Sequence, residues 1–121
     1  MFPISSQSRF LLYTQPADMR KSFDGLQGIV NNHLNKSPLS GEVYIFINKR
    51  RDRIKMLVWD GDGFWLFYKR LEKGRFQTLP SNEAKDIHIS YETLVMLLQG
   101  IDFTRVKRRP RYSGNALNTF A

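Results

Sequence analysis

Three runs of apolar and aromatic residues in the middle of the chain predict a β-sheet. They are 43–48 (VYIFIN), 54–59 (IKMLVW) and 64–69 (FWLFYK), each of strand length and rich in β-branched and aromatic residues. The connections between them, KRRDR (49–53) and DGDG (60–63), are short enough for hairpins, and Asp-Gly is a strong turn signal. The pattern therefore predicts an antiparallel β-meander.

Both faces of this predicted sheet are apolar. Val43, Ile45 and Ile47 alternate with Tyr44 and Phe46, so neither side of the first strand is polar. A sheet of this kind needs cover on both faces. We expect a helix on one face, and a further element or a partner on the other.

The residues before the meander predict one strand and one helix. The segment RFLLYT (9–14) is typical of a short strand, which Pro16 stops. From Asp18 to Leu34, apolar residues recur every three or four positions and form one helical stripe: Met19, Phe23, Leu26, Val30 and Leu34. Asp18 is the expected N-cap, with Ser22 as the alternative if the first turn is irregular.

The residues after the meander predict smaller elements. We expect a short strand around Phe76, a break at Pro80 and an edge strand at 86–89 (DIHI). Ser90 is the expected N-cap of a short helix that ends just before Gly100. One face of this helix carries Leu94, Leu97 and Leu98.

Together these elements predict an α+β fold: a single domain over residues 1–103, with an antiparallel meander of three to five strands packed with two helices. The apolar pattern ends at Thr104, so 104–121 is expected to be a flexible basic tail. The chain has 121 residues, which is one domain's worth of material. It has no cysteine, no apolar run long enough to span a bilayer and no signal-peptide pattern, so we expect a cytoplasmic protein.

Charge is the most informative part of the composition. The net charge is +8, and it is concentrated in three short stretches. Residues 49–55 carry +4, residues 69–75 carry +3 and residues 105–111 carry +5, so the remaining 100 residues carry −4. Clustering of this kind is typical of a protein that binds a polyanion such as nucleic acid. The alternative is that these residues serve only solubility.

Aromatic side chains lie beside two of the basic stretches. In proteins that bind single strands, bases stack on exposed aromatics of a sheet inside a basic groove. The alternative is that the rings form the core, and alternation along the strands would bury about half of them. The rings are Trp59, Phe64, Trp65, Phe67 and Tyr68. Trp65 and Tyr68 are the better candidates for exposure.

Few residues suggest catalysis, and none suggests a cofactor. His33 and His88 are far apart in sequence and lack ligand spacing to a second His or Cys. Asp60 and Asp62, with Lys69, offer a remote alternative: a metal-dependent nuclease with carboxylates for the metal and a lysine for developing charge. A Gly-rich hairpin turn already accounts for both carboxylates, so we expect a protein that is not an enzyme and holds no metal.

A set of motifs resembles the small accessory protein, usually called TnpB, of the insertion-sequence-66 family of bacterial mobile elements. They are PADMRKSFDGL (16–26), PLSGEVYIFINKRRDRIKMLVWDGDGFWLFYKRLEKGRF (38–76) and LLQGID (97–102). This family is distinct from the RNA-guided nucleases that share the name. The resemblance implies a protein needed for transposition, encoded beside a second accessory protein and a transposase, with no assigned catalytic residue.

The sequence therefore predicts a non-catalytic accessory protein for transposition that binds DNA, chiefly through phosphates at the element ends, and assists the transposase. The expected partners are DNA, the transposase and the second accessory protein, with no membrane. The candidate contacts are Lys49, Arg50, Arg51, Arg53, Lys55, Lys69, Arg70, Lys73 and Arg75, with Arg20 and Lys21 at the predicted helix start. The alternative is a module that docks on the transposase without touching DNA.

Overall fold

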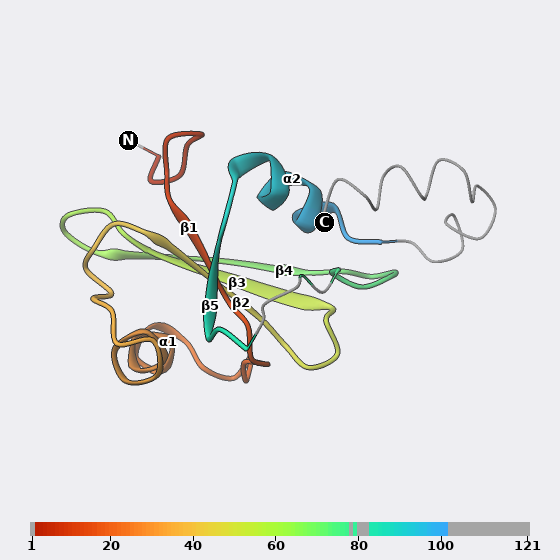
Figure 1. Ribbon diagram of the computed structural model, residues 1–121, viewed down its shortest axis with the longest axis horizontal. Coiled ribbons are helices and arrows are strands. Elements are labelled where there is room, and N and C mark those ends of the chain that lie inside the picture. The colour runs from red at the N-terminus through yellow and green to blue at the C-terminus, as the bar shows by residue number, and fades with distance from the viewer. Residues whose placement is uncertain (1, 78, 80–82, 102–121) are drawn as a thin grey trace.

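The computed structural model describes residues 2–77, 79 and 83–101. Within them the strands are β1 (Phe10–Tyr13), β2 (Val43–Ile47), β3 (Arg53–Trp59), β4 (Phe64–Arg70) and β5 (Asp86–Ile89). The helices are α1 (Phe23–Gly28), which continues into the π-helical turn η1 (Ile29–His33), and α2 (Tyr91–Gln99) (Figure 1). The predicted α+β class is confirmed. The tail prediction for 104–121 and the break at Pro80 lie outside the described residues.

The sheet has the strand order β4-β3-β2-β1-β5. Both predicted hairpins, β2–β3 and β3–β4, are antiparallel, and β5 is an edge strand antiparallel to β1. The predicted antiparallel meander is formed by β2, β3 and β4, but the sheet as a whole is mixed, because β1 and β2 are parallel. Residues 14–42 separate these two strands and contain α1, which is the long crossover that a parallel pair requires.

The two helices cover opposite faces of the sheet, as Figure 1 shows. On one face α2 contributes Leu94 and Leu97 to a core with Phe10, Ile45 and Phe76. On the other face α1 and η1 contribute a second core, whose buried members include Leu26, Val30, Tyr44, Phe46 and Leu57. The expectation of cover on both faces is confirmed, and the chain itself supplies it.

The first helix starts later than predicted. Asp18 is not its N-cap: the Asp18 carboxylate accepts from the backbone N–H of Arg20, which forms a tight turn before the helix. The N-cap position belongs to the alternative, Ser22, although its side chain makes no capping hydrogen bond. Phe23 is 42% exposed and lies outside the core stripe. A tertiary contact of Lys55, described below, explains the late start.

The second helix begins and ends as predicted. The Ser90 hydroxyl accepts from the backbone N–H of Thr93 at 3.1 Å, and Gly100 follows the last turn at φ +71°, a conformation that favours glycine. The strand expected around Phe76 is reduced to a single bridge between Arg75 and Ile101. Phe76 itself is fully buried. None of the helices in the described ranges has the length and hydropathy of a membrane span.

Candidate nucleic-acid interface

Two basic stretches that are separate in sequence meet at one end of the sheet. The β2–β3 turn lies beside the segment that follows β4: the Leu71 backbone N–H donates to the Asp52 carbonyl at 2.8 Å, and Phe76 N–H donates to the Arg51 carbonyl at 2.6 Å. Arg53 and Arg70 lie directly opposite each other in the β3–β4 register. We call this end the basic edge: Lys49, Arg50, Arg51, Arg53, Lys69, Arg70, Lys73 and Arg75.

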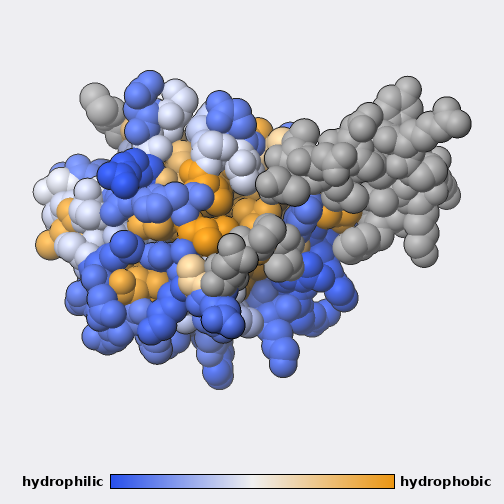
Figure 2. Space-filling model, viewed as in Figure 1, coloured by the Kyte–Doolittle hydropathy of each residue, from blue (hydrophilic) through white to orange (hydrophobic). Residues whose placement is uncertain are grey.

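Figure 2 shows the setting of this edge. Hydrophilic residues cover the lower right of the view, where Figure 1 places the β2–β3 turn, while apolar residues gather towards the centre. Lys49 and Arg50 are exposed at the tip, and Lys69, Arg70, Lys73 and Arg75 are also exposed. Charges in such positions are open to a large polyanion.

The turn that carries the tip arginines is held by a side chain that the sequence reading missed. Asn48 Oδ1 accepts from the backbone N–H groups of Asp52 and Arg53, each at 3.0 Å, and Asn48 Nδ2 donates to the Asp52 carboxylate at 2.7 Å. That amide donor, more than the charges of Arg50 and Arg53, lowers the pKa of Asp52. The bond between Asn48 and the Asp52 carboxylate is therefore fully formed at pH values above the usual carboxyl pKa. It is lost as the pH falls through the lowered pKa of Asp52, so the turn loosens in acid. The preference of Asn and Asp for turns was the available signal.

Some cations of the basic edge already have partners. Arg70 Nη2 lies 3.0 Å from the Glu72 carboxylate, which raises the pKa of Arg70, and Lys69 Nζ donates to the Leu98 carbonyl at 2.7 Å. Both contacts are exposed, and exposed pairs of this kind stabilise weakly, so a phosphate can compete for these groups.

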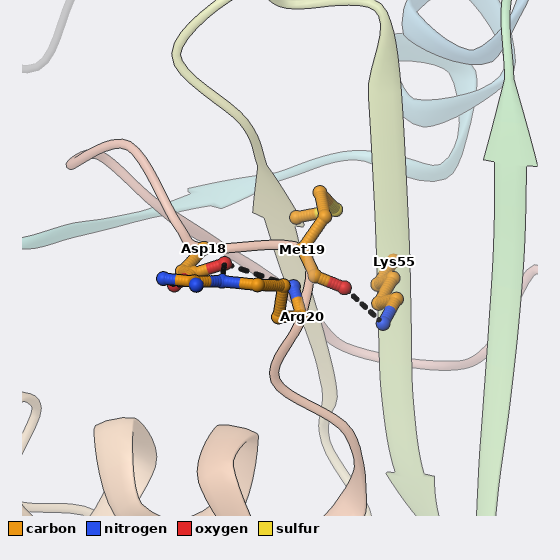
Figure 3. Close-up of polar contacts among 4 residues, drawn as sticks. All are labelled: Asp18, Met19, Arg20 and Lys55. Atoms are coloured by element: carbon orange, nitrogen blue, oxygen red, sulfur yellow. Dashed lines mark hydrogen bonds and ion pairs between the residues drawn. The ribbon is translucent and has the colours of Figure 1, made fainter.

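Lys55 does not belong to the accessible surface. Its side chain is buried, and Nζ donates to the Met19 carbonyl at 2.8 Å (Figure 3). Nζ also donates to the Lys21 carbonyl at 2.7 Å. The prediction that Lys55 contacts phosphate needs correction, because its ammonium is buried and bonded to two backbone carbonyls. In a longer helix the carbonyls of residues 19 and 21 would accept from backbone N–H groups four residues later. They accept from Lys55 instead, which explains the late start of α1.

Arg20 and Lys21 come before the first helix rather than inside it. Arg20 forms a close pair with Asp18, with Nη2 at 2.7 Å from the carboxylate (Figure 3). The hydrogen bonds from Arg20 lower the pKa of Asp18 to about 2. The pair is fully formed above the usual carboxyl pKa and is lost only as the pH falls towards 2, so at neutral pH Asp18 balances the charge of Arg20.

The two aromatics singled out for exposure are the exposed ones. Trp65 is 45% exposed and Tyr68 is 52% exposed, whereas Trp59, Phe64 and Phe67 are half-buried. Trp65 and Tyr68 lie on opposite faces of β4. Tyr68 is opposite Lys55 on the α1 face, and Trp65 is opposite Val58, a core residue of the α2 face. Only Tyr68 adjoins the arginines of the basic edge.

The lysine of the nuclease alternative lies far from its two carboxylates. Asp60 lies at the β3–β4 turn, where its carboxylate accepts from the Trp65 indole at 2.5 Å. This bond is the main reason that the pKa of Asp60 is lowered, and the contact with Asp60 raises the pKa of Asp62. Lys69 is opposite Ile54, whereas Asp60 directly follows Trp59 at the other end of β3. Ile54 and Trp59 are five residues apart along the strand, which is roughly 16 Å at the usual rise per residue. In the described ranges, no three His, Cys, Asp or Glu side chains form a metal-binding group.

The comparisons with known proteins identify the class. The sequence model of the family described as "IS66 Orf2 like protein" matches residues 8–108, so this chain belongs to that family and has a transposition-associated accessory role. Two relatives from Sinorhizobium fredii (strain NBRC 101917 / NGR234) are similar. "Uncharacterized protein y4jC" is 39% identical over 84% of this chain and 86% of its own length. "Uncharacterized protein y4hO" is 38% identical over 85% and 89%. No solved structure matches.

Proposed function

We propose that the protein is a non-catalytic transposition factor that binds DNA through the basic edge and assists the transposase. The observation that supports this most strongly is the convergence of two separate basic stretches, which main-chain hydrogen bonds hold side by side. A framework fixed in this way has little entropy to lose when its charges meet phosphates. Arg50, Arg51 and Arg53 are the central contacts, since guanidinium groups match phosphate oxygens in pairs.

The direct test is a gel shift with element-end DNA and a scrambled duplex of the same length. If the edge meets about five to eight phosphates, the affinity should fall about 10³- to 10⁴-fold between 50 and 200 mM salt. A weak preference for element ends is expected, because phosphate contacts carry little sequence information. Undetectable binding at low salt, together with capture of the purified transposase or of the second accessory protein, would instead favour the protein-docking alternative.

Hydrolysis is not part of the proposed function. Purified protein with Mg²⁺ or Mn²⁺ should leave supercoiled and single-stranded DNA intact over hours, because Asp60, Asp62 and Lys69 do not form one site. Agarose gels of the DNA provide the measurement. DNA cleavage that disappears in Asp60→Asn or Asp62→Asn would contradict this prediction and support the nuclease alternative.

A further inference from the structure

One aromatic ring beside the basic edge lies close to two cations. Tyr68 lies on the α1 face of β4, with Lys55 Nζ 4.6 Å from its ring centroid and Arg53 Nη1 3.4 Å from its hydroxyl oxygen. Lys55 is buried and Tyr68 is half exposed, so the ammonium contacts the inner side of the ring and the outer side faces solvent. Tyr68 also lines a shallow depression of about 350 Å³ with Arg53, Arg70 and Glu72.

Carboxylates balance the positive charge at this depression only in part, because Glu72 pairs with Arg70 while Asp52 acts on Arg53 and Arg70 only through its charge. Arg53 and Arg70 lie directly opposite each other on one face of the sheet, an arrangement that is unfavourable for like charges. Glu72 offsets Arg70, but no carboxylate of the described residues forms an ion pair with Arg53. An anion placed between the two guanidinium groups would relieve this repulsion. An open aromatic face beside an anion site matches the chemistry of a nucleotide unit, which carries a flat base and a phosphate.

Trp65 provides the contrast on the opposite face of the same strand. Its indole stacks on Phe67, with ring centroids 5.9 Å apart and an interplanar angle of 12°. The indole N–H is bound to the Asp60 carboxylate. A base that approached Trp65 would bring its phosphates towards an acidic turn, so comparable exposure does not make Trp65 a comparable site.

We propose that Tyr68 is a stacking platform for an unpaired base of a DNA strand, with Arg53 and Arg70 holding the adjoining phosphates. This inference rests on the proposed DNA binding and adds the kind of DNA that is bound. Bases in a duplex are already stacked on their neighbours, so a ring on the surface of a strand cannot reach their faces. Duplex DNA would therefore meet only the cations, whereas a frayed or single-stranded end would meet both the cations and the ring.

The test compares labelled (dT)₁₂ with a blunt duplex at one salt concentration, using fluorescence anisotropy. Tyr68→Leu should weaken (dT)₁₂ binding about tenfold or more, since one base–aromatic stack contributes about 5- to 150-fold. Its effect on duplex binding should be under about twofold. Tyr68→Phe keeps the ring and should recover most of the affinity that Tyr68→Leu loses. The matched control, Trp65→Leu on the other face, should change neither affinity.

Each failure has a distinct meaning. Equal losses for both DNAs, no loss for (dT)₁₂, or an equal loss in Trp65→Leu would overturn the stacking inference and leave DNA binding by the basic edge intact. Absence of binding to either DNA would overturn the proposed function as well. Displacement of (dT)₁₂ by an equal concentration of free dTMP would assign the site to a mononucleotide and overturn the DNA-strand assignment. Circular dichroism of each variant should show an unchanged fold.

Discussion

Replacing Arg50, Arg51 and Arg53 together with Ala should reduce the DNA affinity about 10²- to 10³-fold at 0.1 M salt. The binding constant scales with salt concentration to a power of about −0.9 per phosphate contact, so the loss of three contacts costs nearly three powers of ten. The log–log salt slope should become less steep by about 2.7. Any preference for element ends should also disappear, because these residues lie on an ordered turn with defined positions. Anisotropy titrations at several salt concentrations measure all three effects.

Two control proteins separate position from net charge. A triple replacement of Arg9, Lys36 and Lys85 by Ala removes the same charge from outside the basic edge and should change the affinity less than about fivefold. Deletion of residues 104–121 removes a stretch of +5. That deletion should weaken binding to all duplexes about equally and keep the end preference. Equal losses in the two triple variants, or end preference that vanishes only with the deletion, would show that the recognition surface lies elsewhere.

Replacing Lys55 with Met should destabilise the protein by about 2–3 kcal/mol, which corresponds to a fall in Tm of about 10 °C. The change leaves the carbonyls of Met19 and Lys21 without their donor. The cost of desolvating a buried ammonium is recovered, but the loss of two charge-assisted bonds outweighs it. The segment before α1 should loosen with it. Urea unfolding and thermal melts give the free energy and Tm.

The matched control for this change is Lys69→Met. Lys69 also donates to one carbonyl, that of Leu98, but it is exposed, and its loss should cost under about 0.5 kcal/mol. If Lys55→Met lowers the free energy of unfolding as little as Lys69→Met does, the hydrogen bonds of Lys55 do not hold residues 19–21 in place. A loss of DNA affinity in the folded Lys55→Met variant would then show that the Lys55 ammonium acts on DNA.

The strands were predictable because their signals are local. β2, β3 and β4 are marked by runs of apolar residues, and DGDG marks the turn between the last two. Ser90 and Gly100 marked the second helix in the same way. The parallel pairing of β1 with β2 was missed because strand order depends on where the 14–42 connection returns, which no short pattern records.

The candidate site was predictable as a composition but not as a surface. Charge clustering identified the residues of the basic edge, and hairpin register brings Arg53 and Arg70 together. The same clustering placed Lys55 among them, because a sequence run does not tell which side chain the rest of the chain covers. The burial of Lys55 depends on two carbonyls more than 30 residues away in sequence. The position of Tyr68 beside Arg53 and Lys55 could also be determined only from the strand register of the sheet.

A ¹⁵N NMR titration of the whole chain with duplex DNA tests directly whether the basic edge binds DNA. Backbone amide shifts should concentrate on residues 48–53 and 69–76, which carry the basic edge, and spare the acidic β3–β4 turn at 60–63. Raising the salt concentration should reverse these shifts together. Shifts that concentrate on α2, on β5 or on residues 60–63, with the basic edge unchanged, would contradict the claim that this edge is the DNA-binding surface.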